Sequence, residues 1–368
     1  MKANPRYILS GGGTGGHIFP AIAIADKLRA QNPDAAILFV GAKGRMEMEK
    51  VPAAGYPIEG LWISGLQRSL SLSNLMFPFK VVNSLYQSSK IINAFKPDVV
   101  LGTGGYASGP LLRMAAMKGI PTLIHEANSY PGITNRLLGK KVDKILVAFE
   151  GMQKYFPGKE LIMTGNPVRK DIMNLEGKKQ EAADFFKLNT RNKTLFVVGG
   201  SLGARTLNES IMGGLDTLAK QNIQLIWQTG KSFHTNAEEA VISQAYNSAR
   251  VFPFISRMDL AYSLTDVVIS RAGAISISEL CLCGKAAILV PSPNVTEDHQ
   301  TKNASALASQ QAAILIPDSS AREILVEKAI TLLADETMKN TLSKNIKTLG
   351  IPDSVDRIIK EINSLIQP

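Results

Sequence analysis

Cysteine is nearly absent from this 368-residue chain, which contains only Cys281 and Cys283. These two residues lie two positions apart on a predicted helix, so their side chains point in different directions. No cluster of His and Cys residues accompanies them, and we interpret them as reduced core residues rather than as a metal or redox site.

Long hydrophobic runs are also missing. Because no stretch of about 18 apolar residues is present, no membrane-spanning helix is expected. The chain passes from Met1 and Lys2 directly into a predicted strand, so no signal peptide is expected.

Acidic residues are too few to balance the basic ones, and the formal net charge is +10. This charge favours anionic partners, namely nucleotides, nucleic acid or an anionic membrane surface. Nucleic acid is disfavoured, because the basic residues are scattered and no known DNA- or RNA-binding pattern is present. Paired carboxylates of the Asp-x-Asp type are lacking, so the sequence predicts no metal site and no cofactor.

Short apolar strands alternate with helices in both halves of the chain, which predicts α/β architecture with parallel sheets covered on both faces. The expected strands of the first half are 7–10, 36–40, 99–102, 122–125 and 144–147, with helices over 20–30 and 81–95. Those of the second half are 194–198, 224–229, 250–254, 267–270, 286–290 and 313–316. The turn-rich segment 164–169 is the expected linker. We therefore expect one domain over 1–164, a second over 165–350, and a C-terminal helix within 351–368 that packs back on the first domain.

Two glycine-rich turns, one in each half, follow predicted strands. The first is Gly11-Gly12-Gly13-Thr14-Gly15-Gly16 and the second is Gly199-Gly200-Ser201-Leu202-Gly203. A strand that ends in glycines before a helix presents backbone N–H groups and the positive end of a helix dipole, which suit phosphate. The alternative is a turn that serves only strand–helix packing. Two such turns predict a phosphorylated ligand held where loops of two domains meet, at the carboxyl ends of the strands.

The first turn also matches the G-x-G-x-x-G pattern of dinucleotide-binding proteins, through Gly11, Gly13 and Gly16. That pattern requires an acid at the end of the second strand, where it holds a ribose. Here strand 37–40 runs into Gly41-Ala42-Lys43-Gly44 without an acid. NAD is therefore disfavoured, whereas NADP stays open.

Several polar residues lie next to these turns and are candidates for chemistry. His17 begins the helix after the first turn, where the helix dipole favours the neutral imidazole, so it could accept a proton or could simply cap the helix. A third glycine loop contains Gly104, Gly105 and Tyr106 and could hold a second phosphate or be a tight loop. Glu126 and Asn128 follow the predicted strand 122–125. Glu126 could have either a catalytic role or a structural hydrogen-bonding role.

The second half offers its own candidates. Ser201 can add a hydroxyl to the second turn, and Arg169 can balance phosphate charge. Glu279 follows a strand–loop–helix segment of small residues and could accept hydrogen bonds from both hydroxyls of a ribose. Segment 298–304 adds amide and imidazole groups, or is an ordinary capped helix start.

These motifs, in this order and spacing, resemble the MurG family of peptidoglycan N-acetylglucosaminyltransferases over nearly the whole chain. Members transfer N-acetylglucosamine from UDP-GlcNAc to lipid I, the undecaprenyl-pyrophosphoryl-MurNAc-pentapeptide. The resemblance implies a GT-B fold, in which two Rossmann-like domains face each other across a cleft. It also implies a peripheral enzyme on the cytoplasmic face of the plasma (inner) membrane, acting in cell-wall synthesis.

The resemblance further implies a role for each candidate residue. The donor would be held by Thr14, Gly15, Gly16, Asn128, Arg169, Ser201, Ile255, Ala274, Ile275, Ser276, Glu279 and Gln300. In that set Ile255 would meet the uracil through its backbone and Glu279 the ribose, and the donor-sugar contact lies open between His299 and Gln300. The acceptor pyrophosphate would lie near Gly13, Gly104, Gly105 and Tyr106. Ala127 stands where the family often has Gln.

The implied reaction is an inverting transfer, in which the 4-hydroxyl of MurNAc attacks the anomeric carbon. His17 is the expected general base and Glu126 the second candidate. Helix N-termini and backbone N–H groups are expected to stabilise the leaving diphosphate. The mixed apolar and basic stretch 61–80 is expected either to contact anionic lipid or to be an ordinary amphipathic helix. Competing readings are another GT-B enzyme (a UDP-sugar epimerase or a glycolipid glycosyltransferase), an NADP oxidoreductase and a non-catalytic nucleotide-sugar-binding protein.

Overall fold

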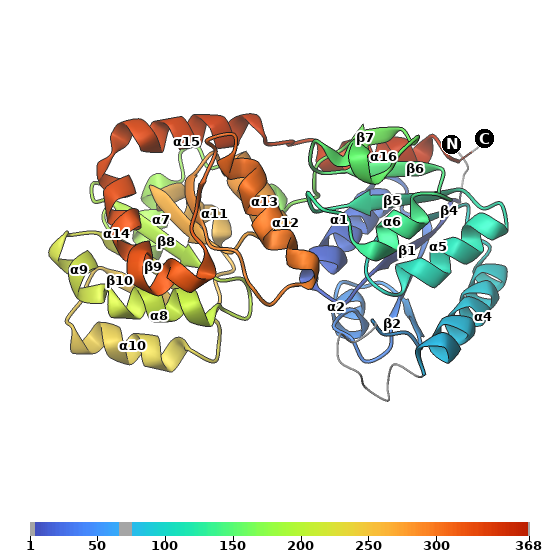
Figure 1. The fold of residues 1–368 in the computed structure, drawn as a ribbon, viewed down its shortest axis with the longest axis horizontal. Coiled ribbons are helices and arrows are strands. Elements are labelled where there is room, and N and C mark those ends of the chain that lie inside the picture. Colours follow the sequence, from blue (N-terminus) through green and yellow to red (C-terminus); the bar gives the residue numbers. More distant parts are fainter. Residues whose placement is uncertain (1–3, 66–75, 367–368) are drawn as a thin grey trace. The chain divides into compact units, whose positions relative to one another are not determined.

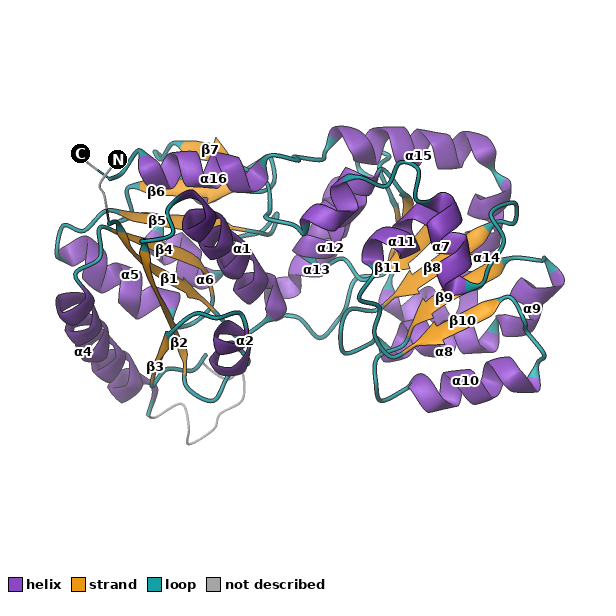
Figure 2. Ribbon diagram, turned by 180° about the vertical axis from the view of Figure 1, so that it is seen from behind, coloured by secondary structure: helices purple, strands orange, loops and turns teal. Residues whose placement is uncertain are grey.

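The computed structural model describes residues 4–65 and 76–366 and divides into two compact units (Figure 1). Unit 1 comprises Met1–Val168 and Asp353–Pro368, and unit 2 comprises Arg169–Pro352. Each unit contains one parallel sheet with helices on both faces, as Figure 2 shows. The α/β class and the parallel sheet predicted for each half are therefore confirmed. The units divide after Val168, whereas the sequence placed the boundary after residue 164.

Unit 1 has a seven-stranded sheet in the order β3-β2-β1-β4-β5-β6-β7. Its strands are β1 (Arg6–Gly11), β2 (Ala36–Ala42), β3 (Ile58–Leu61), β4 (Val99–Gly104), β5 (Thr122–Glu126), β6 (Lys144–Val147) and β7 (Leu161–Met163). Its α-helices are α1 (Gly15–Gln31), α2 (Glu47–Ala53), α4 (Phe77–Phe95), α5 (Ser108–Met117), α6 (Ile133–Leu138) and α16 (Ser354–Asn363), with a 3-10 turn at Met152–Tyr155.

Alternation along β1 explains why this sheet is covered on both sides. Successive side chains of a strand point to opposite faces. Tyr7 and Leu9 enter a core that includes residues of α1 and α16, whereas Ile8 enters a second core that includes residues of α4 and α5. Strands that are apolar at every position are typical of a parallel sheet buried on both faces.

The C-terminal helix α16 belongs to unit 1 although it is distant in sequence. Its side chains Ile358, Ile359 and Ile362 are buried in the same core as α1. The Lys27 ammonium lies 2.6 Å from the Asp356 carboxylate, and that of Lys144 lies 2.6 Å from Glu361. An apolar stripe and two flanking ion pairs therefore hold α16 on the first domain.

Unit 2 repeats the plan with a six-stranded sheet in the order β10-β9-β8-β11-β12-β13. The strands are β8 (Thr194–Val198), β9 (Gln224–Gln228), β10 (Ala249–Phe252), β11 (Val267–Ser270), β12 (Ala286–Leu289) and β13 (Ile314–Leu315). The α-helices are α7 (Lys179–Phe186), α8 (Arg205–Gly213), α9 (Leu215–Lys220), α10 (His234–Ser243), α11 (Met258–Leu264), α12 (Ala274–Cys283), α13 (His299–Ala308), α14 (Ala321–Ala334) and α15 (Glu336–Thr348). Short 3-10 turns cover Lys170–Met173, Thr296–Asp298 and Asp318–Ser320.

Both sheets reverse their strand order at one point. In unit 1 this point lies between β1 and β4, and in unit 2 it lies between β8 and β11. Open α/β sheets bind ligands in the crevice at such a switch point, outside the carboxyl ends of the strands. The two predicted glycine turns follow β1 and β8, so each leaves its sheet at the switch point of its unit.

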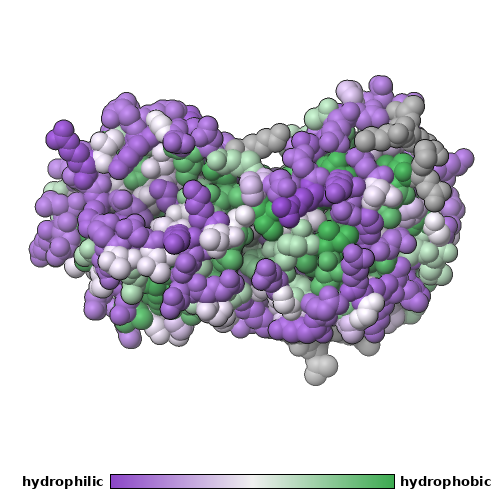
Figure 3. Space-filling view, turned by 90° about the horizontal axis from the view of Figure 1, so that it is seen from above, coloured by the Kyte–Doolittle hydropathy of each residue, from purple (hydrophilic) through white to green (hydrophobic). Residues whose placement is uncertain are grey.

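The surface carries both polar and apolar groups. Hydrophilic residues predominate on the face shown in Figure 3. Of the helices in the described part of the chain, none is both long and apolar enough to cross a membrane. Cys281 and Cys283 are free cysteines, and burial raises the pKa of Cys281 to about 12.

Candidate functional site

The two glycine loops of unit 1 pack against each other at the switch point. The Gly12 N–H donates to the Gly104 carbonyl at 3.2 Å. A Cβ atom on Gly105 would lie 2.5 Å from the Gly12 carbonyl oxygen, so the two backbones approach too closely for any side chain. Gly104 and Gly105 also have φ angles of +109° and +94°, which favour glycine. The glycine loop that contains Gly104 and Gly105 and the glycine turn 11–16 are therefore packed directly against each other.

His17 lies beside these loops, as the sequence analysis proposed. A Cβ atom on Gly104 would be 2.6 Å from the His17 Nδ1 atom, so the imidazole lies against the backbone of Gly104. The Thr103 hydroxyl donates to the His17 carbonyl at 2.7 Å, and the His17 N–H donates to the Thr14 carbonyl at 3.1 Å. The ring of Tyr106 lies against Gly65.

A buried acid that the sequence analysis missed lies under the first turn. Glu47, in the first turn of α2, accepts hydrogen bonds from the Gly13 N–H at 2.9 Å and from the Ala42 N–H at 3.0 Å. The Gly13 amide, which the sequence analysis assigned to the acceptor phosphate, is thus already engaged. The sequence shows no acid at the end of β2, but Glu47, five residues after Ala42, brings its carboxylate to that strand end. It is fully buried against backbone, so it is not offered to a ribose.

At the end of β5, His125 and Glu126 are both buried. The Nε2 atom of His125 lies 2.8 Å from the Gly165 carbonyl. Its Nδ1 atom has no hydrogen-bond partner in the described parts of the chain. Burial lowers the pKa of His125 from its usual 6.5 to about 4, and the nearby His17 lowers it as well. His125 is therefore neutral at physiological pH, with the proton on Nε2.

The contacts of Glu126 give it a structural task. Its carboxylate accepts hydrogen bonds from the N–H and the side-chain amide of Asn128, from the Gly132 N–H and from the Asn135 amide, at 2.8–3.2 Å. Burial raises the pKa of Glu126, and these hydrogen bonds oppose the change. Four N–H donors surround this carboxylate, so its oxygens are engaged within unit 1 rather than free to meet a substrate hydroxyl. The geometry therefore favours the hydrogen-bonding alternative for Glu126 and leaves Asn128 oriented by it.

In unit 2, the glycine turn after β8 is packed against the loop after β9. A Cβ atom on Gly203 would overlap the Thr229 carbonyl, and one on Gly230 would overlap the Leu202 carbonyl. Ser201 lies exposed at the top of this turn. The turn is thus held by backbone packing, and Ser201 on it is exposed.

Gln228, at the end of β9, joins this turn to the segment predicted to meet a base. Its side-chain N–H donates to the Gly200 carbonyl at 3.0 Å, and its side-chain oxygen accepts from the Ile255 N–H at 2.8 Å. A base recognised through the Ile255 N–H would therefore have to displace Gln228. No sequence pattern pointed to Gln228.

Glu279 is buried in α12 and paired with Arg169. The guanidinium Nε atom of Arg169 lies 3.1 Å from one carboxylate oxygen, and the Tyr262 hydroxyl donates to the other at 3.3 Å. Burial raises the pKa of Glu279, whereas the Arg169 charge and the Tyr262 hydroxyl lower it. The structure thus brings together two residues, Arg169 and Glu279, that lie 110 positions apart and that the sequence analysis assigned to the donor.

The remaining donor-site candidates lie around the start of α12. Ala274, Ile275 and Ser276 form its first turn. The side chain of Gln300 accepts from the Ser292 N–H at 2.8 Å and so holds the loop after β12.

Arg271, directly after β11, clamps that same loop. Its Nη1 atom donates to the carbonyls of Val290 and Pro291, both at 3.0 Å, and to the carboxylate of Asp318. A second oxygen of Asp318 accepts from the Thr206 hydroxyl at 3.0 Å. This half-buried network joins the loops after β11 and β12 to the start of α8.

The candidates fall into two groups, one in each unit. Thr14, Gly15, Gly16 and Asn128 lie in unit 1 with the acceptor-side residues, and the other donor-site candidates lie in unit 2. Across residues 4–65 and 76–366, no three His, Cys, Asp or Glu side chains are grouped in a way that could hold a metal ion. The groups present can donate hydrogen bonds to phosphate, accept hydrogen bonds from sugar hydroxyls and, at His17, accept a proton.

Comparison with known proteins agrees with this arrangement. Residues 7–147 match the glycosyltransferase family 28 N-terminal domain, and residues 194–358 match the C-terminal domain of the same family. The chain is 54% identical, over 98% of its length and 97% of the relative's, to a protein of Cytophaga hutchinsonii. That protein is named UDP-N-acetylglucosamine–N-acetylmuramyl-(pentapeptide) pyrophosphoryl-undecaprenol N-acetylglucosamine transferase. A protein of the same name from Parabacteroides distasonis is also 54% identical, over 98% of both chains.

Solved structures show the same fold. The crystal structure of Acinetobacter baumannii MurG has a TM-score of 0.81 and 28% identity, covering 98% of this chain and 99% of that one. A UDP-GlcNAc 2-epimerase from Neisseria meningitidis has a TM-score of 0.66 at 15% identity, covering 98% and 100% of the two chains, and shows a likeness of fold alone. The sequence-based resemblance and the predicted GT-B fold are thereby confirmed. Since both domain models match and the relatives align along the whole chain, the protein belongs to glycosyltransferase family 28.

Proposed function

We propose that this chain transfers GlcNAc from UDP-GlcNAc to the 4-hydroxyl of MurNAc in lipid I, which gives lipid II for peptidoglycan synthesis. The observation that carries this proposal is the 54% identity, over nearly the full length of both chains, to transferases named for that reaction. The glycine turns at the two switch points support it, because each presents backbone where a diphosphate group can approach.

The donor is bound by unit 2 in this proposal. Glu279 accepts hydrogen bonds from the ribose hydroxyls, and the Arg169 charge favours the ionised form of its carboxylate. The exposed Ser201 and the first turn of α12 donate to the diphosphate. Their amides stabilise the leaving UDP as its charge develops, and this step needs no metal ion. Activity that disappears in EDTA and returns only with a divalent cation would contradict this last point.

The acceptor is bound by unit 1, and His17 is the general base. The imidazole lies against Gly104, in one of the two glycine loops that are expected to meet the acceptor pyrophosphate. Glu126 does not compete for this role, because four N–H groups already surround its carboxylate. We expect His17→Ala to retain affinity for both substrates and to lose at least about a hundredfold in kcat.

Radiolabelled UDP-GlcNAc with a lipid I analogue tests the proposal. A lipid-linked disaccharide is the expected product. Release of free UDP with a 2-epimerised sugar would instead support an epimerase, and reduction or oxidation of NADP(H) would support an oxidoreductase. Binding of the nucleotide sugar without turnover would leave only a binding protein.

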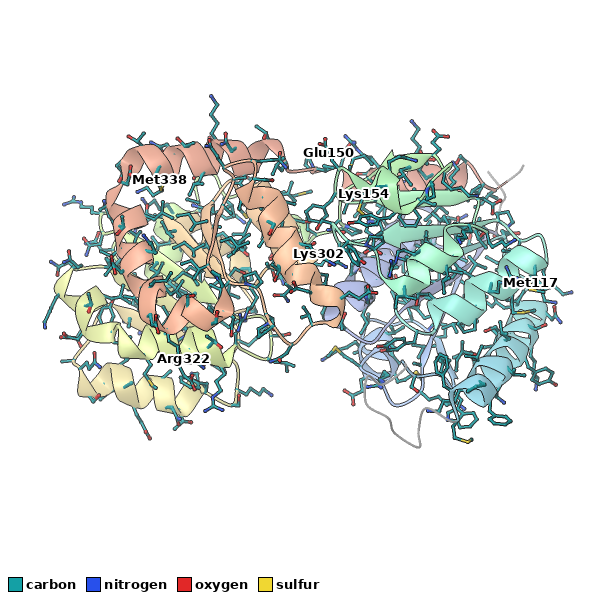
Figure 4. All side chains as sticks on the ribbon, in the orientation of Figure 1. Met117, Glu150, Lys154, Lys302, Arg322 and Met338 are labelled. Carbon is teal, nitrogen blue, oxygen red and sulfur yellow. The ribbon has the colours of Figure 1, made fainter. Side chains whose placement is uncertain are left out.

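The enzyme is further proposed to work as a peripheral protein on the cytoplasmic face of the plasma membrane. The support lies on α4, where Phe79, Val82 and Tyr86 recur at helical spacing and are 66%, 67% and 71% exposed. Met117, at the end of α5 beside α4, is 64% exposed (Figure 4). Apolar side chains on a helix next to cationic ones suit an anionic lipid surface. Of the stretch first assigned to lipid, residues 66–75 lie outside the described part of the chain.

Vesicle flotation tests this surface. The wild-type protein is expected to float with vesicles that contain anionic phospholipid and to be released by high salt. Replacing Phe79 and Tyr86 by Ser is expected to abolish flotation. Replacing Ile242, which is 77% exposed in unit 2, by Ser is the matched control. If both variants float equally well, the exposed face of α4 is not the membrane contact.

A further inference from the structure

The fully buried carboxylate of Glu47 has no part in the function proposed so far. It belongs to the first turn of α2 and contacts two segments that are far from each other in sequence, the Gly13 amide after β1 and the Ala42 amide at the end of β2. Burying a carboxylate is costly unless hydrogen bonds replace its water. Two N–H donors at 2.9 and 3.0 Å provide that replacement here.

The neighbouring backbone is shaped to admit this carboxyl group. A Cβ atom on Gly12 would lie 2.5 Å from the Glu47 Cδ atom, and one on Gly41 would lie 2.5 Å from its Cγ atom. Real Cβ atoms essentially never approach so closely. Gly12 in the first turn and Gly41 near the end of β2 are therefore explained by Glu47 rather than by a ligand.

Glu47 fixes the turn from which His17 emerges. Gly12 is held on one side by the Gly104 carbonyl, and Gly13 is held on the other by Glu47. After Gly13 the chain passes through Thr14 into α1, which carries His17 in its first turn. With both Gly12 and Gly13 bonded, the path of the chain into Thr14 and α1 is restricted.

We propose that Glu47 is a positioning residue for the transferase reaction, acting through the first glycine turn on His17 and on the amides of the turn that face the acceptor. This inference rests on the proposed function. It assigns Glu47 to the acceptor half of the reaction, because all its contacts lie in unit 1 and the donor candidates Arg169 and Glu279 lie in unit 2.

The variant Glu47→Gln tests the proposal with little change in shape. A glutamine side chain has one acceptor oxygen, and its NH₂ group would face one of the two backbone N–H groups. One of the two hydrogen bonds is therefore lost. Glu49→Gln is the matched control, since Glu49 is an exposed acid two residues further along the same helix.

Steady-state kinetics with UDP-GlcNAc and a lipid I analogue give the first readout. We expect E47Q to lose at least about tenfold in kcat while KM for UDP-GlcNAc stays within about twofold of wild type. E49Q should match wild type in both. Equal kcat in E47Q and E49Q would overturn the proposal, and so would a parallel loss of donor affinity, which would indicate a general effect on the fold.

Amide exchange followed by mass spectrometry gives the second readout, which needs no activity. In E47Q one of two peptides, spanning 11–16 or 41–45, should exchange at least about tenfold faster than in wild type. An inactive wild-type enzyme would refute the proposed function, whereas exchange would still decide whether Glu47 holds the turn. If E47Q does not fold, Glu47→Asp replaces it, because its shorter side chain cannot reach both N–H groups; unchanged kcat in that variant would equally overturn the proposal.

Discussion

Replacing His125 by Gln should reduce the acid sensitivity of unit 1. The imidazole is fully buried, its Nε2 atom donates to the Gly165 carbonyl, and its pKa is lowered from 6.5 to about 4. A glutamine N–H group can reach the same carbonyl but cannot be protonated in this range. The substitution therefore separates the hydrogen bond from the ionisation.

The sign and size follow from proton linkage. Between pH 6.5 and about 4 the unfolded chain binds a proton at His125 that the folded chain does not bind. The free energy of unfolding of unit 1 therefore decreases as the pH falls through this window. At about 1.4 kcal/mol per pH unit, His125 accounts for a loss of about 2.5 kcal/mol between pH 7.5 and pH 4.5.

The assay must report each unit separately, because two units need not unfold together. Urea unfolding with pulse-labelled amide exchange does so, through peptides of β4 and β5 for unit 1 and of β8 and β11 for unit 2. The H125Q variant should start with a lower stability at pH 7.5 and then lose about 2.5 kcal/mol less than wild type by pH 4.5. Unit 2 should behave identically in both proteins. Parallel pH profiles of unit 1 in the two proteins would refute the reasoning.

Two further predictions concern the donor site and the packed glycine loops. Arg169→Ala removes the charge that lowers the pKa of the buried Glu279, so this carboxylate becomes protonated at a higher pH. UDP affinity, measured by calorimetry, should therefore weaken several-fold more at about pH 6 than at about pH 8. Arg169→Lys keeps the charge and should not show this pH dependence. Gly105→Ala places a Cβ atom 2.5 Å from the Gly12 carbonyl at a φ of +94° and should destabilise unit 1 by at least about 2 kcal/mol in urea unfolding. Its control, Gly119→Ala, has φ +69° and nothing within 4 Å, and should cost only about 1 kcal/mol.

The sequence predicted those elements whose pattern is local. Strands such as β6 and β11 were located to the residue, since each is a run of apolar and β-branched side chains. The strand β3 (Ile58–Leu61) was missed, because Glu59 and Gly60 interrupt its apolar pattern and only pairing with β2 makes it a strand.

The same distinction applies to the site. Glycines and polar residues that follow a strand were found, because the carboxyl ends of parallel strands carry the loops that bind ligands. Glu47, Gln228 and Arg271 act on the backbone of segments distant in sequence, and no spacing encodes such contacts. One signal was present for Glu47: a glycine near the end of β2, Gly41, often marks a close approach by another group.

The glycines of the two turns therefore perform two different tasks, and only one of these is the phosphate-binding task that their motif suggests. Gly11 and Gly12 of the first turn and Gly203 of the second meet other protein atoms wherever a Cβ atom would be placed. Gly13 and Gly200 have φ angles of +82° and +88°, and nothing lies within 4 Å of such a Cβ atom, so a ligand has room beside the backbone at these two positions, where the Gly13 N–H itself already donates to Glu47. A glycine-rich motif thus overstates the surface available to a phosphate group, because its tightly packed members hold the turn in shape for its open ones.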